Sequence, residues 1–240
     1  MHPHPSPWDH TPITSLALAT TGADPTTAQV CGYALTTHTG QGATTHHGLV
    51  KTPEPIPAAA TAVHGITTED AAWGATPDAA MNVITSTLLG APGVIAAQNA
   101  AWVFATLNLW AQAHSLAPFT PTAPLLDPLV LDKAIGGRAC QGRRTLAGLC
   151  EQWHVPAPQW RSPRFTAPAV PQLTRTLVTV TPKFRRQSPD QLGESCRQWY
   201  YEAEAEFETY LQSKGKEPDV FWDWPVAPEP MAADPDNPPF

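Results

Sequence analysis

Charged residues are scarce in this chain, and basic residues are the scarcer kind. Only 15% of the 240 residues are charged, and 14 Lys and Arg stand against 21 Asp and Glu, which gives a formal net charge of −7. That balance argues against a protein that binds nucleic acid through bulk positive charge. The hydrophobic fraction of 42% excludes a wholly disordered chain and is large enough for a sizeable core.

Three further features are missing. No apolar run reaches the roughly 18 residues of a membrane-spanning helix, so we expect no membrane partner. The start, MHPHPSPWDH, has neither the basic nor the apolar segment of a secretion signal. The four cysteines form no Cys-x-x-Cys pair, which predicts reduced, buried thiols in a cytoplasmic protein rather than disulfides or a zinc site.

The charges that are present are segregated along the chain. Residues 1–132 contain one base, Lys51, and eight acids, whereas residues 133–197 contain eleven bases and three acids. Residues 198–240 contain two bases and ten acids. The middle block could present a basic surface to a phosphate backbone. Alternatively, its charges are solvated or pair with the acidic block that follows, because clustering in sequence does not prove a common face.

Local patterns predict an α/β domain whose sheet is antiparallel first and parallel later. Residues 13–20 form a short apolar run closed by Thr21-Gly22, typical of a buried strand, and two β-rich segments around Gly40-Gln41-Gly42 predict a hairpin. The later elements are expected in this order: a helix start at Thr67, a helix at 77–89, a strand at 93–97, a helix at 100–114, an apolar run read as a strand at 125–131, and helices at 145–153 and 188–215.

The C-terminal half is divided by proline. Five prolines within residues 155–171 disfavour a helix there, and residues 172–180 fit either a helix or a strand. Ser188-Pro189-Asp190 predicts the start of a long helix with a packed stripe of Trp199, Phe207, Tyr210 and Leu211. We therefore expect a disordered tail (1–10), a main domain (11–183), a helical extension (184–226) and an acidic, proline-rich tail (227–240).

Five segments together resemble the DnaQ-like, or DEDD, 3′–5′ exonucleases. Residues 18–25 resemble the first motif, DTETTGLDP, and residues 56–67 match the loop IP…ATAVHGIT. Residues 97–100 resemble AHNAxYD, 125–132 resemble IDPLVLD, and 143–150 resemble KRTLxxLC. The similarity covers roughly residues 12–226. It implies a ribonuclease-H-like mixed sheet of about five strands flanked by helices, plus a long C-terminal helix.

The resemblance also implies a chemistry that this chain lacks the residues to perform. Family members hydrolyse the 3′-terminal phosphodiester with two Mg²⁺ or Mn²⁺ ions, which four acids hold while a histidine acts as the base. Here the acid positions align with Ala17, Ala19, Val103 and Ala169, and the histidine position aligns with Arg164. A guanidinium cannot accept a proton at working pH. We therefore expect no bound metal cofactor and a catalytically inactive pseudo-exonuclease.

Alternative readings remain. An active exonuclease with atypical ligands would need other acids, but those nearby fit structural roles, in a turn (Asp24), at a helix start (Glu69 and Asp70) or at family positions with structural roles (Asp127 and Asp132). A gene copy without a selected role would also show such losses. The inactive protein would act by binding, and the resemblance and the basic block suggest single-stranded DNA or a nucleotide as the partner, with these contacts: His64, Arg138, Arg143, Arg144 and Arg164. For His64, a purely structural place in its loop is the competing interpretation.

The last residues carry one more signal. The end, DPDNPPF, resembles the acidic C-terminal peptide of bacterial single-stranded-DNA-binding proteins, which partners bind through the Phe ring and the terminal carboxylate. Phe240 is thus a candidate contact for replication or repair proteins, which would make the chain a protein-interaction module. An ordinary disordered tail is the alternative.

Overall fold

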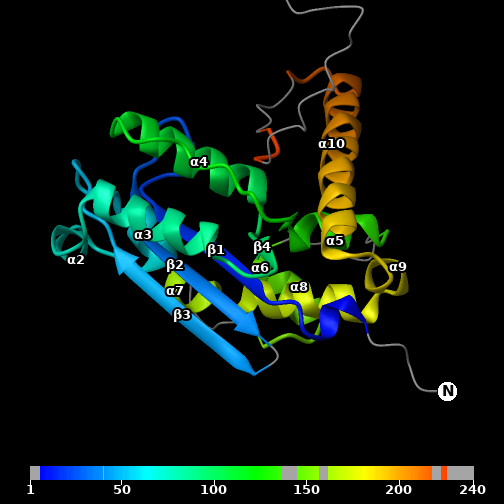
Figure 1. Ribbon diagram of the computed structural model, residues 1–240. Helices are drawn as coiled ribbons and strands as arrows, with labels where there is room; N and C mark the ends of the chain where they lie inside the picture. Colours follow the sequence, from blue (N-terminus) through cyan, green and yellow to red (C-terminus); the bar gives the residue numbers. More distant parts are fainter. Residues whose placement is uncertain (1–5, 40, 137–144, 157–161, 218–222, 226–240) are drawn as a thin grey trace, which may run out of the picture.

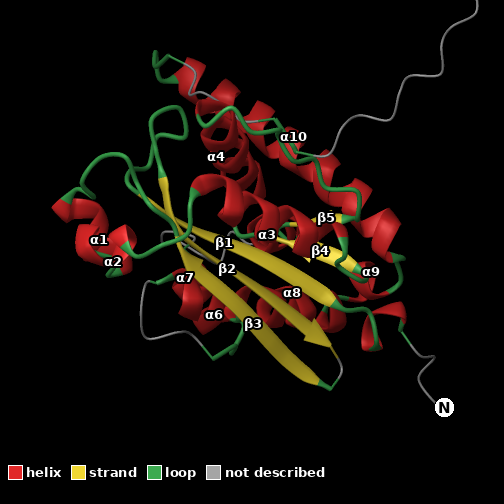
Figure 2. Cartoon of the chain, turned by 60° about the vertical axis from the view of Figure 1, so that its left-hand side comes forward, coloured by secondary structure: helices red, strands yellow, loops and turns green. Residues whose placement is uncertain are grey.

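The computed structural model describes residues 6–39, 41–136, 145–156, 162–217 and 223–225. At its centre lies a five-stranded sheet with the strand order β3-β2-β1-β4-β5 (Figure 2). The strands are β1 (Ile13–Thr20), β2 (Val30–Thr39), β3 (Gly42–Leu49), β4 (Val94–Ala96) and β5 (Leu125–Leu126). The first three are antiparallel, and β4 and β5 join in parallel. The expected mixed α/β sheet is confirmed.

Helices cover both faces of this sheet. Figures 1 and 2 show α3 and α4 on one face and α6, α7 and α8 against the other. None of the helices in the described part of the chain is long and apolar enough to cross a lipid bilayer. The helices are α1 (Ala58–His64), α2 (Thr68–Ala72), α3 (Pro77–Leu89), α4 (Ala100–Ala113), α5 (Pro128–Ala134), α6 (Leu146–Gln152), α7 (Pro163–Thr166), α8 (Ala169–Val180), α9 (Pro182–Arg185) and α10 (Pro189–Ser213).

Helix starts follow their capping signals closely. Thr67 caps α2, and its side chain and that of Asp70 exchange hydrogen bonds with each other's backbone N–H. Ser188 and Gln191 form the same reciprocal box at the start of α10. Pro77 and Pro189 occupy first helical positions, where a missing N–H costs nothing. The predicted helices at 77–89, 100–114, 145–153 and 188–215 are therefore confirmed.

Proline misled the sequence interpretation at two places. Residues 125–131 form only a two-residue strand before α5, because Asp127 caps that helix and Pro128 takes its first position. Residues 163–166 and 169–171 are helical, although the prolines of residues 155–171 predicted no helix there. Residues 172–180, which fitted either a helix or a strand, continue the helix. Pro163 begins α7 and Pro171 lies in the first turn of α8, where the absence of an N–H is tolerated.

The expectation of a disordered tail over residues 1–10 is wrong for Ser6 to His10. Ser6 and Asp9 form a capping box around a short 3-10 turn, η1 (Pro7–Asp9). Trp8 is fully buried, and its Nε1–H donates to the carbonyls of Phe184 (3.3 Å) and Gln187 (3.0 Å). The N-terminal segment is thereby anchored to the region around α9.

The expected packed stripe of α10 holds only in part. Gly193 brings the helix against the start of β5, since an added Cβ would lie 3.0 Å from the Cβ of Pro124. Leu211 is buried and Trp199 packs against the core, but Phe207 and Tyr210 are 43% and 55% exposed. Their rings stack on each other at 6.3 Å, at the end of α10 that projects from the body in Figure 1.

A buried carboxylate joins two helix starts. Asp127 Oδ2 accepts the Ala100 N–H of α4, and Oδ1 accepts the Leu129 N–H of α5, both at 2.8 Å. The side chain of Asn99, which has a left-handed backbone (φ 59°), caps nothing, so Asp127 supplies an acceptor to α4. Burial raises the pKa of Asp127 to about 6, and the N–H donors partly oppose this shift. Asp132, also buried, accepts the Nε1–H of Trp153 at 2.9 Å.

We expect Asp127→Asn to lower the free energy of unfolding, by about 1–3 kcal/mol at low pH, because one buried N–H then faces an amide NH₂. The folded pKa lies above the ordinary value, so the stability contributed by Asp127 is present below about pH 4 and is lost as the pH rises through 6. The difference in the free energy of unfolding between the unmodified protein and the variant should therefore become smaller between pH 4.5 and 7, as measured by urea denaturation. A deficit that grows with pH would contradict this, and Asp24→Asn in an exposed turn is the control.

Candidate functional site

The carboxyl end of β1 is a meeting point of several elements. β1 and β4 are parallel, so both strands end at the same edge of the sheet, where α4 begins. The Nε1–H of Trp102 donates to the Ala23 carbonyl at 2.9 Å, which ties the first turn of α4 to the loop after β1. The Ser15 hydroxyl donates to the Ala167 carbonyl at 2.9 Å, which ties β1 to the turn between α7 and α8.

The aligned motif positions come from these same elements, and the structure gives them apolar surroundings. Ala17 and Ala19 share a face of β1, and Ala17 is half-buried. Ala19, Val103 and Ala169 are only 3–5% exposed. Ala19 packs in a small apolar cluster that includes Cys31, Ile56, Ala60, Ile66 and Ala71.

These residues do not fit a pair of divalent cations. Mg²⁺ and Mn²⁺ require oxygen ligands, and alanine and valine offer none. In the part of the chain that the structure describes, no three His, Cys, Asp or Glu side chains form a group that could hold a metal ion. Asp24, in the loop after β1, instead accepts the Thr26 hydroxyl and N–H, which hold its pKa below the usual value.

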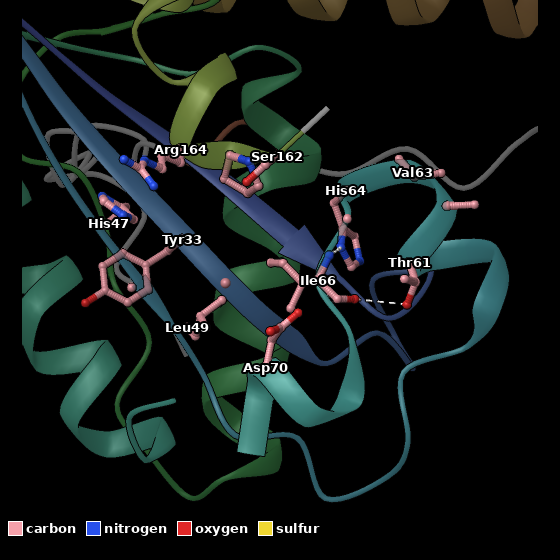
Figure 3. Close-up of a pocket in the computed structure, with 15 residues that line it drawn as sticks. Tyr33, His47, Leu49, Thr61, Val63, His64, Ile66, Asp70, Ser162 and Arg164 are labelled. Atoms are coloured by element: carbon pink, nitrogen blue, oxygen red, sulfur yellow. Dashed lines mark hydrogen bonds between the residues drawn. The ribbon is translucent and has the colours of Figure 1, made fainter. Parts of the chain in front are cut away.

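A hollow of about 630 Å³ opens beside this end of the sheet (Figure 3). Its walls come from β2 and β3, from α1 with the loop that follows it, and from α2 and α7. Gly32 leaves room for Ile66, since a Cβ at Gly32 would lie 2.8 Å from the Ile66 Cδ1. The Thr61 hydroxyl donates to the Ile66 carbonyl at 2.9 Å and fixes the loop between them.

His64 lines the hollow but has a strong structural role there. The Ile66 N–H donates to His64 Nδ1 at 3.1 Å, so the proton of the neutral ring lies on Nε2, which is 3.6 Å from Cys31 Sγ. The side chain is 6% exposed, and burial lowers its pKa, although the Thr20 backbone opposes the shift. The neutral imidazole thus holds the turn whose left-handed residue is Gly65 (φ 78°).

Charged side chains mark opposite sides of the hollow. Arg164, on α7, is exposed beside it, and Figure 3 shows it across the hollow from Asp70 of α2. The Asp70 carboxylate accepts the Thr67 N–H and hydroxyl, both at 2.9 Å, and these bonds lower its pKa. Arg164 is therefore the cation of the hollow among the described residues that line it.

Several cations of the basic block, where the structure describes it, bond to other groups of the chain. Arg138, Arg143 and Arg144 lie outside the described residues. The Arg175 guanidinium donates to the backbone carbonyls of Trp8 and Thr11. Lys183 donates to the Ala134 carbonyl and lies over the Trp199 ring, and Arg197 pairs with Glu194 at 2.6 Å. Where the structure describes this block, much of its charge is used inside the fold.

Of the contacts predicted from the sequence, His64 and Arg164 line the hollow, but most of the other lining residues were not predicted. Tyr33 and His47 of the hairpin line the hollow together with Leu49. The strand pairing that brings them there, Tyr33 with Gly48 and Gly32 with Leu49, was visible only as a hairpin of unknown register. Phe240 and the rest of residues 226–240 lie outside the described residues.

No protein-family model matches the chain, and no curated protein matches it by sequence. Solved structures of exonuclease I are similar in fold. The Escherichia coli enzyme in complex with a dA16 oligonucleotide has a TM-score of 0.62 at 13% identity, over 72% of this chain and 42% of that chain. An ExoI/SSB-Ct complex has a TM-score of 0.62 at 13% identity, over 73% of this chain and 42% of that chain. A product-bound exonuclease I has a TM-score of 0.60 at 14% identity, over 73% of this chain and 45% of that chain.

The chain thus spans about two-fifths of the length of the exonuclease I chains it resembles. At such low identity the likeness shows the fold alone. The mixed five-stranded sheet, its flanking helices and the long α10 match the ribonuclease-H-like fold of a 3′–5′ exonuclease.

Proposed function

We propose that this chain is a non-catalytic protein on an exonuclease scaffold, which binds the end of a single-stranded nucleic acid in the hollow between β3, α1 and α7. The observation that carries the proposal is that apolar residues occupy the positions aligned with the family's metal-binding acids: Ala17, Ala19, Val103 and Ala169. Three of these side chains are nearly inaccessible, so a dication brought there would lose its water and gain no carboxylate.

Binding is supported by the hollow itself. Its volume of about 630 Å³ falls in the usual range for a small-molecule site. The Arg164 guanidinium offers paired N–H donors to a phosphate, and Val63, Leu49 and Ile66 supply apolar surface for a base. His64 contributes by holding the wall, and we place Arg138, Arg143 and Arg144 as further phosphate contacts. The free, buried thiols of Cys31, Cys150 and Cys196 agree with a cytoplasmic location.

The unmodified protein should not shorten single-stranded DNA from its 3′ end with Mg²⁺, Mn²⁺ or EDTA, as measured on denaturing gels with 3′-protected and unprotected oligonucleotides. Metal-dependent shortening would overturn the proposal and favour an active exonuclease with atypical ligands. The matched variant carries Ala17→Asp, Ala19→Glu, Val103→Asp and Ala169→Asp. It should gain Mn²⁺ binding in calorimetry if these positions form the former metal site, and a circular-dichroism melt checks that it folds.

Arg164→Ala should weaken binding of a fluorescent single-stranded oligonucleotide in anisotropy titrations. Losing one phosphate contact should also reduce the slope of log K against log salt by about 0.7. Arg186→Ala is the control, because Arg186 is exposed just after α9, and Figure 1 shows α7 and α9 at opposite ends of α8. Equal losses in the two variants would mean that the hollow is not the binding site.

A second function, recruitment of replication or repair proteins through residues 227–240, is favoured by Pro238-Pro239-Phe240 and the acids before them. The full chain should displace a labelled SSB C-terminal peptide from exonuclease I, because a Phe ring that follows acids and prolines fits the same kind of pocket. Phe240→Ala and deletion of residues 227–240 should abolish displacement and leave oligonucleotide binding unchanged. Displacement that survives both changes would contradict this role.

A further inference from the structure

Trp73 is the most exposed large apolar side chain in the described part of the chain. It is 90% exposed, whereas the other exposed aromatic side chains are between 43% and 55% exposed. An indole exposed to this degree leaves a large apolar surface in water, but single exposed apolar residues are common, so the neighbours of Trp73 must show what it contacts. The buried tryptophans, Trp8, Trp110 and Trp224, are at most 4% exposed, so Trp73 stands apart among residues of its own kind.

The backbone of Trp73 is held firmly. Its N–H bonds to the Asp70 carbonyl at 3.2 Å, at the end of α2. The next residue, Gly74, presses on the end of β3, where a Cβ would lie 2.6 Å from the Leu49 carbonyl carbon. Ala75 then pairs with the chain after β3, donating to the Leu49 carbonyl at 2.8 Å and accepting the Lys51 N–H at 2.9 Å. The backbone position of Trp73 is thereby fixed between α2 and the chain that follows β3.

Trp73 continues the line of residues that leads out of the hollow. Ile66 and Asp70 both line the hollow, and Trp73 follows Asp70 by three residues. Residues three apart lie on the same side of a helix, here about 4.5 Å further along its axis. Trp73 is the residue after α2, and its neighbour Gly74 packs against Leu49, which also lines the hollow, so the Trp73 backbone lies next to the wall of the hollow.

A basic residue lies nearby in the fold. Lys51 is the single base among the first 132 residues, it is exposed, and its backbone N–H bonds to the carbonyl of Ala75, two residues from Trp73. Exposed aromatic rings and cations that lie along one path bind single-stranded nucleic acid without reading its sequence. Glu69 and Asp70 of α2 repel phosphate groups, whereas Lys51 attracts them. This charge difference favours a strand whose sugar–phosphate backbone lies on the Lys51 side and whose base lies on the Trp73 ring.

We infer that Trp73 is a stacking platform for a base of single-stranded nucleic acid, which extends the strand's path out of the hollow toward Lys51. The inference rests on the proposed function, because it needs a strand whose end lies in the hollow. It adds a length dependence: a mononucleotide fills the hollow alone, whereas a longer strand also reaches the ring.

The test compares the full chain with Trp73→Ala, Trp73→Phe and Tyr210→Ala, the last being an exposed aromatic control on α10. In anisotropy titrations with an oligothymidylate of about 12 nucleotides, Trp73→Ala should weaken binding about fivefold or more, and Trp73→Phe should recover most of it. Competition by thymidine monophosphate should change by less than about twofold, since stacking contributes only to the longer strand. Tyr210→Ala should bind like the unmodified chain.

The outcomes separate this inference from the proposal beneath it. If the unmodified chain and Trp73→Ala bind the oligonucleotide equally, the inference is overturned and the binding proposal stands. If Trp73→Ala weakens the mononucleotide and the oligonucleotide alike, Trp73 acts within the hollow and the extended path is wrong. If the unmodified chain binds neither probe, the proposed function fails and the inference fails with it. Trp73 is exposed, so its replacement should leave the melting temperature unchanged.

Discussion

The pairing of β1 on both of its edges is the constraint on which the rest of the structure depends. β2 bonds along the whole of β1 on one side and β4 bonds on the other, so the strand cannot shift or twist independently. The loop after its carboxyl end is bonded to α4 through Trp102, and the turn between α7 and α8 is bonded to Ser15, near the start of the strand. Asp127 fixes the starts of α4 and α5, because its one carboxylate accepts a backbone N–H from the first turn of each helix.

Small apolar side chains occupy the positions that align with the family's metal-binding acids. The resemblance to 3′–5′ exonucleases implies metal-binding acids at these positions, whereas Ala19, Val103 and Ala169 are buried among apolar side chains. An accessible hollow lies beside them, bounded by the β2–β3 hairpin and the loop around His64. The described residues that line it include one arginine and several apolar side chains, and no described side chains combine into a metal site.

Local signals in the sequence predicted most elements of the fold, because strand alternation and helix caps are properties of short segments. The errors share a physical cause. Pro163 and Pro171 belong to a segment whose prolines predicted no helix, and Pro128 belongs to a run predicted as a strand. Each of them lies in a first helical turn, where its neighbours decide whether a helix follows. Trp8 was assigned to a disordered tail because only distant carbonyls, those of Phe184 and Gln187, reveal that it is buried.

At the positions that the resemblance aligns with metal-binding acids, the sequence by itself determined that no oxygen ligand is present, since alanine and valine side chains have none in any conformation. It also determined the class of the fold, through motifs that keep their order along the chain. Only the tertiary structure decided where the charges lie. Arg175 and Lys183 bond to backbone carbonyls, and Arg164 and Asp70, 94 residues apart in the sequence, line one hollow. The position of a residue along the chain does not determine where its side chain points. Packing between segments that are distant in sequence determines that direction.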